Sequence, residues 1–191
     1  GRYGAIGVQM WRTGELVTPF LEPGTPWFNK PPLGLWIHGL SLHALGVGVW
    51  QARLPTVLAG LGVVLVVVAT VRRFAPRSQA LAVGLVLATT LEFFRRTKEI
   101  SLDMWQALFV FAAVYAVARA ATMLPAARAR AAWFALAGVA LGLALLCKQL
   151  VALGAIPVLA VWLIAAGRWR LAPWLGLTAV VAVAVAAPWH L

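Results

Sequence analysis

Residues Ala131–Gly167 read AAWFALAGVALGLALLCKQLVALGAIPVLAVWLIAAG, a continuous apolar stretch whose only charge is Lys148, near its middle. One transmembrane helix needs about 20 residues, because each residue adds about 1.5 Å of rise. The stretch is nearly twice that long, and Gly154 and Pro157 follow the lysine. Two membrane helices with a tight reversal at Lys148 therefore fit better than one helix with a lysine at the centre of the bilayer.

The rest of the chain after residue 50 repeats this character. Apolar runs stand at about 53–71, 79–94, 104–122, 131–147, 149–167 and 171–188. The composition agrees, because 63% of the residues are hydrophobic and 11% are charged, which is more apolar surface than a soluble domain of this size can bury. We therefore expect an all-α integral membrane protein with about six transmembrane helices, in which residues 51–191 form one bundle.

Residues 1–50 differ from the bundle, because they contain most of the turn signals: Glu22-Pro23-Gly24, Thr25-Pro26 and Lys30-Pro31-Pro32. Helices are predicted at about 4–13 and 32–46, both too short to span a bilayer. We expect this part to be an extracytoplasmic loop with short helices at the membrane interface. Since the chain starts on Gly rather than Met, we expect a piece of a longer protein, truncated at both ends.

The loop charges separate into two sets when the six spans are alternated across the membrane. One side receives only arginines and no acid: Arg72, Arg73, Arg77, Arg119, Arg128, Arg130, Arg168 and Arg170. These arginines lie in short loops, where the positive-inside rule is most reliable, so we place them in the cytoplasm of a multi-pass protein of the cell (inner or plasma) membrane. The net charge of +11 does not indicate a nucleic-acid partner, because the basic residues lie at the ends of apolar segments.

All acids and all lysines then converge on the extracytoplasmic side. The ammonium of Lys148 must either snorkel to the interface or bind an anion such as a phosphate. Lys30 has the same two options, and Pro31-Pro32 stiffens the chain beside it and starts a helix. Asp103 begins an apolar helix, whose positive end stabilises a carboxylate, so it is either a simple N-cap or a site residue.

Other kinds of site have no support in the sequence. His38 and His43 are five residues apart, a spacing that does not place two imidazoles on one helix face, so no metal site is predicted. No Gly-rich phosphate loop, Cys-His cluster or Ser-His-Asp order is visible, so no nucleotide is expected. No cofactor is certain, and a divalent metal stays open as an alternative that the sequence does not support.

The order of several short motifs resembles the membrane glycosyltransferases of the GT-C class. These motifs are Arg2-Tyr3, Lys30-Pro31-Pro32-Leu33, Ala52-Arg53-Leu54-Pro55, Leu102-Asp103 and the reversal at Lys148. The group with the greatest similarity is the one related to protein O-mannosyltransferases and lipid A aminoarabinose transferases.

The resemblance implies an enzyme that passes a sugar from a polyprenyl-phosphate carrier to a lipid, glycan or protein acceptor on the extracytoplasmic face, with inversion. It implies substrate-binding roles for Arg2, Tyr3, Lys30 and Lys148, and it leaves Asp103 as the catalytic candidate, the best remaining acid to orient sugar or acceptor. In the family, an Asp-Glu pair precedes the x-Arg-Tyr position, and its Asp is the candidate base. This chain begins at that x, so we expect the piece alone to be inactive.

Two positions depart from the aminoarabinose transferases. Asn29 stands where they carry Glu, which puts in doubt any family metal site that uses that Glu, and Gln149 stands where Gly is usual. Two alternatives stay open: a transporter or flippase for an anionic lipid or glycolipid, and a non-catalytic relative that binds lipid. A transporter should show interrupted helices and an internal repeat, and neither is visible in the sequence.

Overall fold

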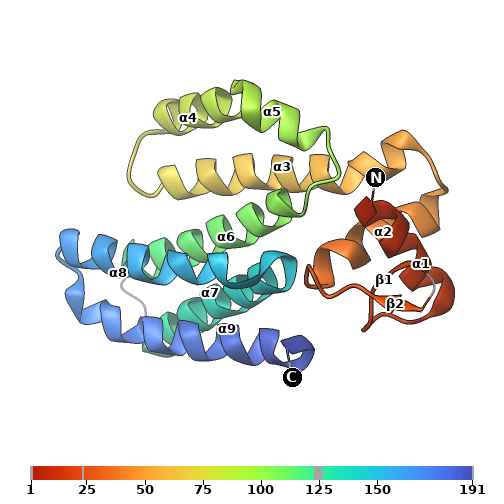
Figure 1. Cartoon of the computed structure of the whole chain (residues 1–191). Helices are drawn as coiled ribbons and strands as arrows, with labels where there is room; N and C mark the ends of the chain where they lie inside the picture. Colours follow the sequence, from red (N-terminus) through yellow and green to blue (C-terminus); the bar gives the residue numbers. More distant parts are fainter. Residues whose placement is uncertain (1, 23, 123–126, 191) are drawn as a thin grey trace.

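The computed structural model describes residues 2–22, 24–122 and 127–190, and these residues form a mostly helical chain (Figure 1). The N-terminal part contains two short helices and a two-stranded antiparallel ribbon: α1 (Arg2–Thr13), β1 (Phe20–Glu22), β2 (Thr25–Pro26) and α2 (Leu33–Leu45). Gly24, in the turn between the strands, has a φ of +82°, which the turn requires and glycine tolerates. The predicted short helices are therefore confirmed, whereas the ribbon is an addition.

The remaining helices lie with their axes roughly parallel or antiparallel to one another (Figure 1). They are α3 (Val49–Val71), α4 (Arg77–Thr89), α5 (Leu91–Thr97), α6 (Leu102–Thr122), α7 (Ala127–Lys148), the 3-10 helix η1 (Gln149–Gly154), α8 (Ala155–Ala165), the 3-10 helix η2 (Trp169–Trp174) and α9 (Leu175–His190). Because α3 begins at Val49, the proposed boundary between a loop domain and the bundle falls in its first turn. That division remains a prediction.

Within the described residues, four helical segments are long and apolar enough to cross a membrane: Val49–Val71, Leu102–Thr122, Ala127–Lys148 and Trp169–Trp189. The other two predicted spans form shorter pieces. The first is divided at Thr90, whose backbone is extended (φ −61°, ψ 123°), into α4 and α5, and the second begins as η1 before it continues as α8. The chain is an all-α, multi-pass membrane protein, and the total of six spans remains a prediction.

The reversal at Lys148 is confirmed. Helix α7 ends at this residue, whose backbone leaves the helical region (φ −155°, ψ 51°), and the chain then turns back through η1 into α8 (Figure 1). Lysine at the end of α7 is also in a favourable place electrostatically, because the C-terminal end of a helix carries partial negative charge.

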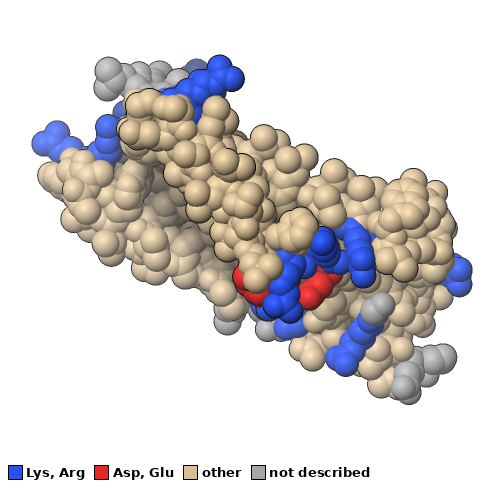
Figure 2. Space-filling view, turned by 90° about the horizontal axis from the view of Figure 1, so that it is seen from above, with Lys and Arg blue, Asp and Glu red and all other residues tan. Residues whose placement is uncertain are grey.

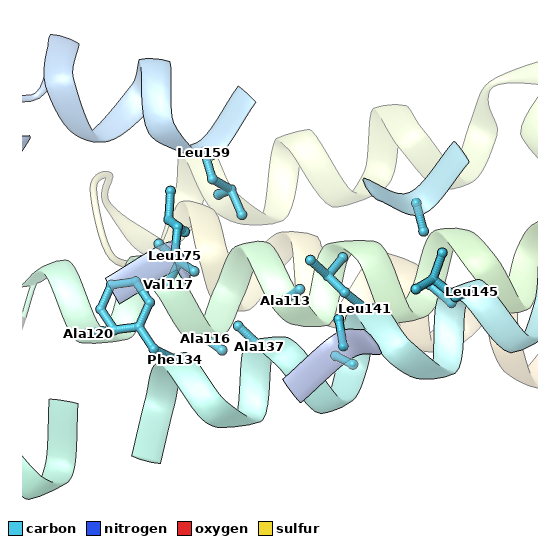
Figure 3. Packing of buried hydrophobic residues seen from close by; sticks show 14 of the residues in the cluster. Ala113, Ala116, Val117, Ala120, Phe134, Ala137, Leu141, Leu145, Leu159 and Leu175 are labelled. Atoms are coloured by element: carbon cyan, nitrogen blue, oxygen red, sulfur yellow. The ribbon is translucent and has the colours of Figure 1, made fainter. Parts of the chain in front are cut away.

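The main core lies between α6, α7, α8 and α9 and consists largely of alanine and leucine (Figure 3). Ala113, Ala116 and Ala120 recur at helical spacing on α6 and pack against Ala137 and Leu141 of α7, all of them fully or almost fully buried. Small residues let two helices approach closely, which increases the packing contacts that hold helices together in lipid.

Glycines allow a second close approach, between α7 and α9. A Cβ added at Gly138 would lie 2.7 Å from the backbone oxygen of Thr178, and one at Gly142 would lie 2.9 Å from that of Ala182. The Thr178 hydroxyl donates to the Phe134 carbonyl at 2.9 Å across the same contact. This hydrogen bond and the close approach of the two helix backbones hold α9 against α7.

Helices α1 and α2 cross at two glycines, and α2 docks on the start of α3. A Cβ added at Gly7 would lie 2.5 Å from the Leu35 carbonyl oxygen, so no larger residue fits there without displacement. In α3, Pro55 has no N–H for the Gln51 carbonyl, and the Ser41 hydroxyl of α2 donates to that carbonyl instead, at 2.6 Å. The proline therefore leaves the Gln51 carbonyl free to accept the hydrogen bond that joins α2 to α3.

Candidate functional site

The charged side chains divide between the two ends of the bundle. The loops α3–α4 and α8–η2 carry arginines without acids, whereas the starts of α3 and α6, the end of α7 and helix α5 lie at the other end (Figure 1). On the face shown in Figure 2, acidic side chains lie among lysines and arginines near the middle of the molecule, and the basic side chains at the left of the view have no acid beside them. We call the mixed-charge end the site end.

An ion pair joins α6 to α7 at the site end. The Lys148 Nζ lies 2.6 Å from Oδ1 of Asp103, and their side chains are 37% and 49% exposed. Asp103 lies in the first turn of α6 and Lys148 in the last turn of α7, so each charge faces the helix end that stabilises it. An exposed pair of this kind contributes no more than about 1 kcal/mol, so an incoming anion can replace the carboxylate at little cost.

Gln106 fixes the backbone beneath this pair. It lies three residues after Asp103, on the same face of α6, and is 9% exposed. Its side-chain Nε2 donates to the Lys148 carbonyl oxygen at 3.4 Å, which satisfies one of the carbonyls left open at the end of α7. Sequence reasoning missed Gln106, although a polar residue one turn after Asp103 in an apolar run is a usable signal.

Lys30 lies on the segment that packs beside the start of α6. The next two residues, Pro31 and Pro32, are buried, and a Cβ added at Gly34 would collide with the Leu102 side chain. Leu102 immediately precedes Asp103, so the backbone of the Lys30 segment lies near the Asp103–Lys148 pair. None of the ion pairs formed by the described residues includes Lys30.

Arg2 and Tyr3 lie in a different place. They line a cavity of about 650 Å³ together with Arg53, Lys98 and Glu99, which we call the basic hollow; its other walls are Val49, Ala52 and Ile100. The Tyr3 ring also packs against Trp27, with ring centroids 6.1 Å apart. The structure therefore brings the sequence-predicted residues together as two groups, and Asp103, Lys148 and Lys30 are not among the residues that line the basic hollow.

A buried histidine lies between the two groups. His38 of α2 is 0% exposed, its Nδ1 is 3.1 Å from the Ala52 carbonyl oxygen, and its Nε2 is 3.5 Å from the Thr56 hydroxyl. The same hydroxyl accepts the backbone N–H of Ser101 at 3.2 Å. Burial lowers the pKa of His38, and contacts with the backbone of Ala52 and Ser101 oppose that shift in part. The neutral imidazole thus links α2 and α3 to the segment that leads into Asp103.

Metal-binding side chains do not gather in the part of the chain that the structure describes, where no three His, Cys, Asp or Glu residues come together. The side chain of Gln149 lies outside the described residues, as does that of His190. Arg53 and Lys98, by contrast, line a cavity that sequence reasoning did not foresee, because only the fold brings the start of α3 next to the end of α5.

The model of the dolichyl-phosphate-mannose-protein mannosyltransferase family matches residues 29–191. Among curated proteins, the chain is similar to the undecaprenyl phosphate-alpha-4-amino-4-deoxy-L-arabinose arabinosyl transferases of Edwardsiella ictaluri (33% identical over 100% of this chain and 35% of that protein) and Erwinia tasmaniensis (31%, over 98% and 34%). The chain therefore spans about a third of the length of the curated relatives it matches.

Two solved structures are also similar along almost the whole chain. They are crystal structures of ArnT from Cupriavidus metallidurans, in the apo state (TM-score 0.86, 29% identity, covering 99% of this chain and 36% of that one) and bound to undecaprenyl phosphate (TM-score 0.87, 28% identity, 99% and 35%). The sequence-level resemblance to a GT-C membrane glycosyltransferase is thus confirmed. With most of its length matched by the family model, this chain belongs to the dolichyl-phosphate-mannose-protein mannosyltransferase family.

Proposed function

We propose that the protein is a membrane glycosyltransferase that moves a sugar from a polyprenyl-phosphate carrier to a lipid, glycan or protein acceptor. The observation that carries the proposal is the Lys148–Asp103 pair, in which a cation and a carboxylate meet at the ends of two apolar helices. The names of the relatives, which include undecaprenyl phosphate as the carrier, and membership in a family named for dolichyl-phosphate-mannose support this reading.

The leaving group of such a donor is a lipid phosphate, which is anionic and lies at headgroup depth. As the bond between the sugar and the phosphate breaks, negative charge develops on the phosphate oxygen, and a cation placed there lowers the barrier. Lys148 and Lys30 are the residues we assign to this phosphate. The phosphate would take the place that the Asp103 carboxylate occupies against Lys148, because the exposed ion pair is easily exchanged.

The released Asp103 carboxylate then has a role of its own. It can accept a hydrogen bond from a sugar or acceptor hydroxyl and so orient the group that reacts, while Gln106 keeps the end of α7 in register with α6. Arg2 binds the phosphate or a neighbouring carboxylate, and Tyr3 donates a hydrogen bond to sugar or phosphate. Attack by the acceptor opposite the phosphate inverts the anomeric centre: the bond between the sugar and the acceptor oxygen forms as the bond between the sugar and the phosphate breaks, and the Asp of the family's Asp-Glu pair takes the acceptor's proton. The proposal assigns no metal.

Replacement of Asp103 tests this assignment. In the full-length protein, Asp103→Asn should lower the rate of sugar transfer from a polyprenyl-phosphate donor by roughly tenfold to a hundredfold, because a charge-assisted hydrogen bond to the reacting group is lost. Glu92→Gln is the matched control, since Glu92 is exposed on α5 and forms an ion pair with Arg96. An unchanged rate in Asp103→Asn, with the control active, would reduce Asp103 to a helix cap.

The site end should face the extracytoplasmic side. Single cysteines at Thr25 and at Arg128, both exposed and at opposite ends of the chain's fold, should react differently with a membrane-impermeant maleimide on intact cells. We expect Cys at position 25 to be labelled and Cys at position 128 to be labelled only after the membrane is opened. The native Cys147 is buried and gives a low background. Equal labelling, or the reverse order, would contradict the assigned orientation.

A further inference from the structure

A second hollow continues the basic hollow along α1. Its volume is about 780 Å³, and most of its walls are apolar or small residues of α1 and of the segment between α2 and α3, such as Ala5, Val8 and Val47. Val49, Ala52 and Ile100 line both hollows, so the two lie side by side. We call the second one the apolar hollow.

The basic hollow has an excess of positive charge. Arg2, Arg53 and Lys98 line it against a single acid, Glu99, which already lies 3.9 Å from the guanidinium of Arg96. None of the three lining cations takes part in an ion pair among the described residues. Like charges gathered around one cavity repel each other, and a bound anion removes that repulsion.

The position of the two hollows relative to the membrane fits a lipid headgroup. Val49 is the first residue of the α3 span, and the neighbouring Val47, Val49 and Trp50 are 74%, 68% and 61% exposed. Exposed valine and tryptophan at the start of a membrane helix are typical of contact with the interfacial layer of a bilayer. We therefore expect the cations to lie at the level of lipid phosphates. The hollow beside them is mostly apolar, and its polar lining residues are Gln9, Arg12 and Thr13.

We propose that the two hollows form one groove that binds an anionic phospholipid of the surrounding leaflet. The phosphate lies against Arg53 and Lys98, and one acyl chain enters the apolar hollow along α1. An anionic phospholipid matches both hollows, because its phosphate is opposite in charge to the basic hollow and its acyl chain is apolar like the second one. A zwitterionic lipid carries a cation of its own next to the phosphate, so it gains less from the basic hollow. A soluble phosphate has no acyl chain and would leave the apolar hollow empty. The groove shares Arg2 and Tyr3 with the residues assigned to the sugar donor, but Asp103, Lys148 and Lys30 do not line it. Its occupant, a phospholipid of the surrounding leaflet, goes beyond the proposed transfer reaction.

The test measures lipid binding to the purified full-length protein. Delipidated protein in detergent is titrated with dioleoyl phosphatidylglycerol or dioleoyl phosphatidylcholine, and bound lipid is counted by native mass spectrometry. We expect phosphatidylglycerol to bind roughly tenfold more tightly, the effect of one charge-assisted contact. The double variant Arg53→Gln/Lys98→Gln should bring the two affinities within about twofold, since only nonspecific attraction remains. The control variant Arg168→Gln/Arg170→Gln also removes two positive charges, but at the opposite end of the bundle. It should keep the preference for phosphatidylglycerol over phosphatidylcholine.

A third variant probes the apolar hollow. Ala5 is exposed in that hollow, so Ala5→Trp fills it without a change of charge. We expect this variant to lose the advantage of dioleoyl over dihexanoyl phosphatidylglycerol while it retains the headgroup preference.

Several results would overturn the proposal. Equal affinity of the parent protein for both headgroups would do so, and so would a preference that survives in Arg53→Gln/Lys98→Gln. Competition by undecaprenyl phosphate at equal concentration, lost in the same double variant, would assign the groove to the sugar carrier instead. The measurement does not depend on sugar transfer, so a failure of the proposed function leaves its result unaffected.

Discussion

Lys148→Met should lower sugar transfer by roughly a hundredfold to a thousandfold in the full-length protein, the loss that follows removal of one group that stabilises developing negative charge. Methionine keeps the length and the apolar stem of the side chain, so the packing at the end of α7 should persist. The effect should lie mainly in kcat, because the charge on the leaving phosphate is larger in the transition state than in the bound donor. Transfer from a radiolabelled polyprenyl-phosphate sugar measures it.

A double-variant cycle separates this role from a structural one. If the Lys148–Asp103 pair only holds α6 to α7, Lys148→Met/Asp103→Asn should restore stability and activity, because no unpaired charge remains. We expect the double variant to stay as inactive as Lys148→Met. Arg168→Gln, which removes one cation at the opposite end, should leave the rate unchanged. Normal turnover in Lys148→Met would remove Lys148 from the mechanism.

Lys30→Met is the second change with a large expected effect, again roughly a hundredfold in kcat/KM. Lys30 precedes two buried prolines and is part of the segment that packs near Leu102. The rigid backbone limits the positions of the ammonium, so a neighbouring lysine cannot replace it. Titration of donor concentration gives kcat and KM separately, and we expect both to change.

Lys30→Arg provides the control for charge alone. The guanidinium keeps the positive charge but differs in shape and reach, so this variant should recover only part of the activity. Full activity in Lys30→Met, with the protein inserted at the normal level, would show that Lys30 only snorkels to the interface. Equal loss in Lys30→Met and Lys30→Arg would instead indicate that the site depends on the exact placement of the ammonium.

Much of the architecture could be predicted from the sequence because lipid imposes simple rules. The length of the Ala131–Gly167 stretch and its one lysine required a reversal at Lys148, and α7 ends there. The turn residues around Gly24 and Pro31 separated the two short N-terminal helices from each other. Helical periodicity and span length are local properties, so they need no knowledge of the packing partners.

Features that depend on contacts between distant residues could not be predicted. The break at Thr90 divides the apolar run at 79–94, and sequence reasoning did not use the polar residues there, Thr89, Thr90 and Glu92, as a signal. The contacts of His38 with Ala52 and Thr56 follow from how α2 docks on α3. The pairing of Asp103 with Lys148 was foreseen only as a shared membrane face, because a residue pair this far apart in sequence is decided by helix packing.

The central claim is that lysines at one rim of the bundle hold the phosphate of a lipid carrier. It is tested most directly by a structure of the full-length protein with a non-transferable polyprenyl-phosphate sugar bound. The account predicts a phosphate oxygen within about 3.5 Å of Nζ of Lys148 and of Lys30, with the Asp103 carboxylate moved from Lys148 to the sugar. A phosphate bound elsewhere, with the Asp103–Lys148 contact intact, would contradict it.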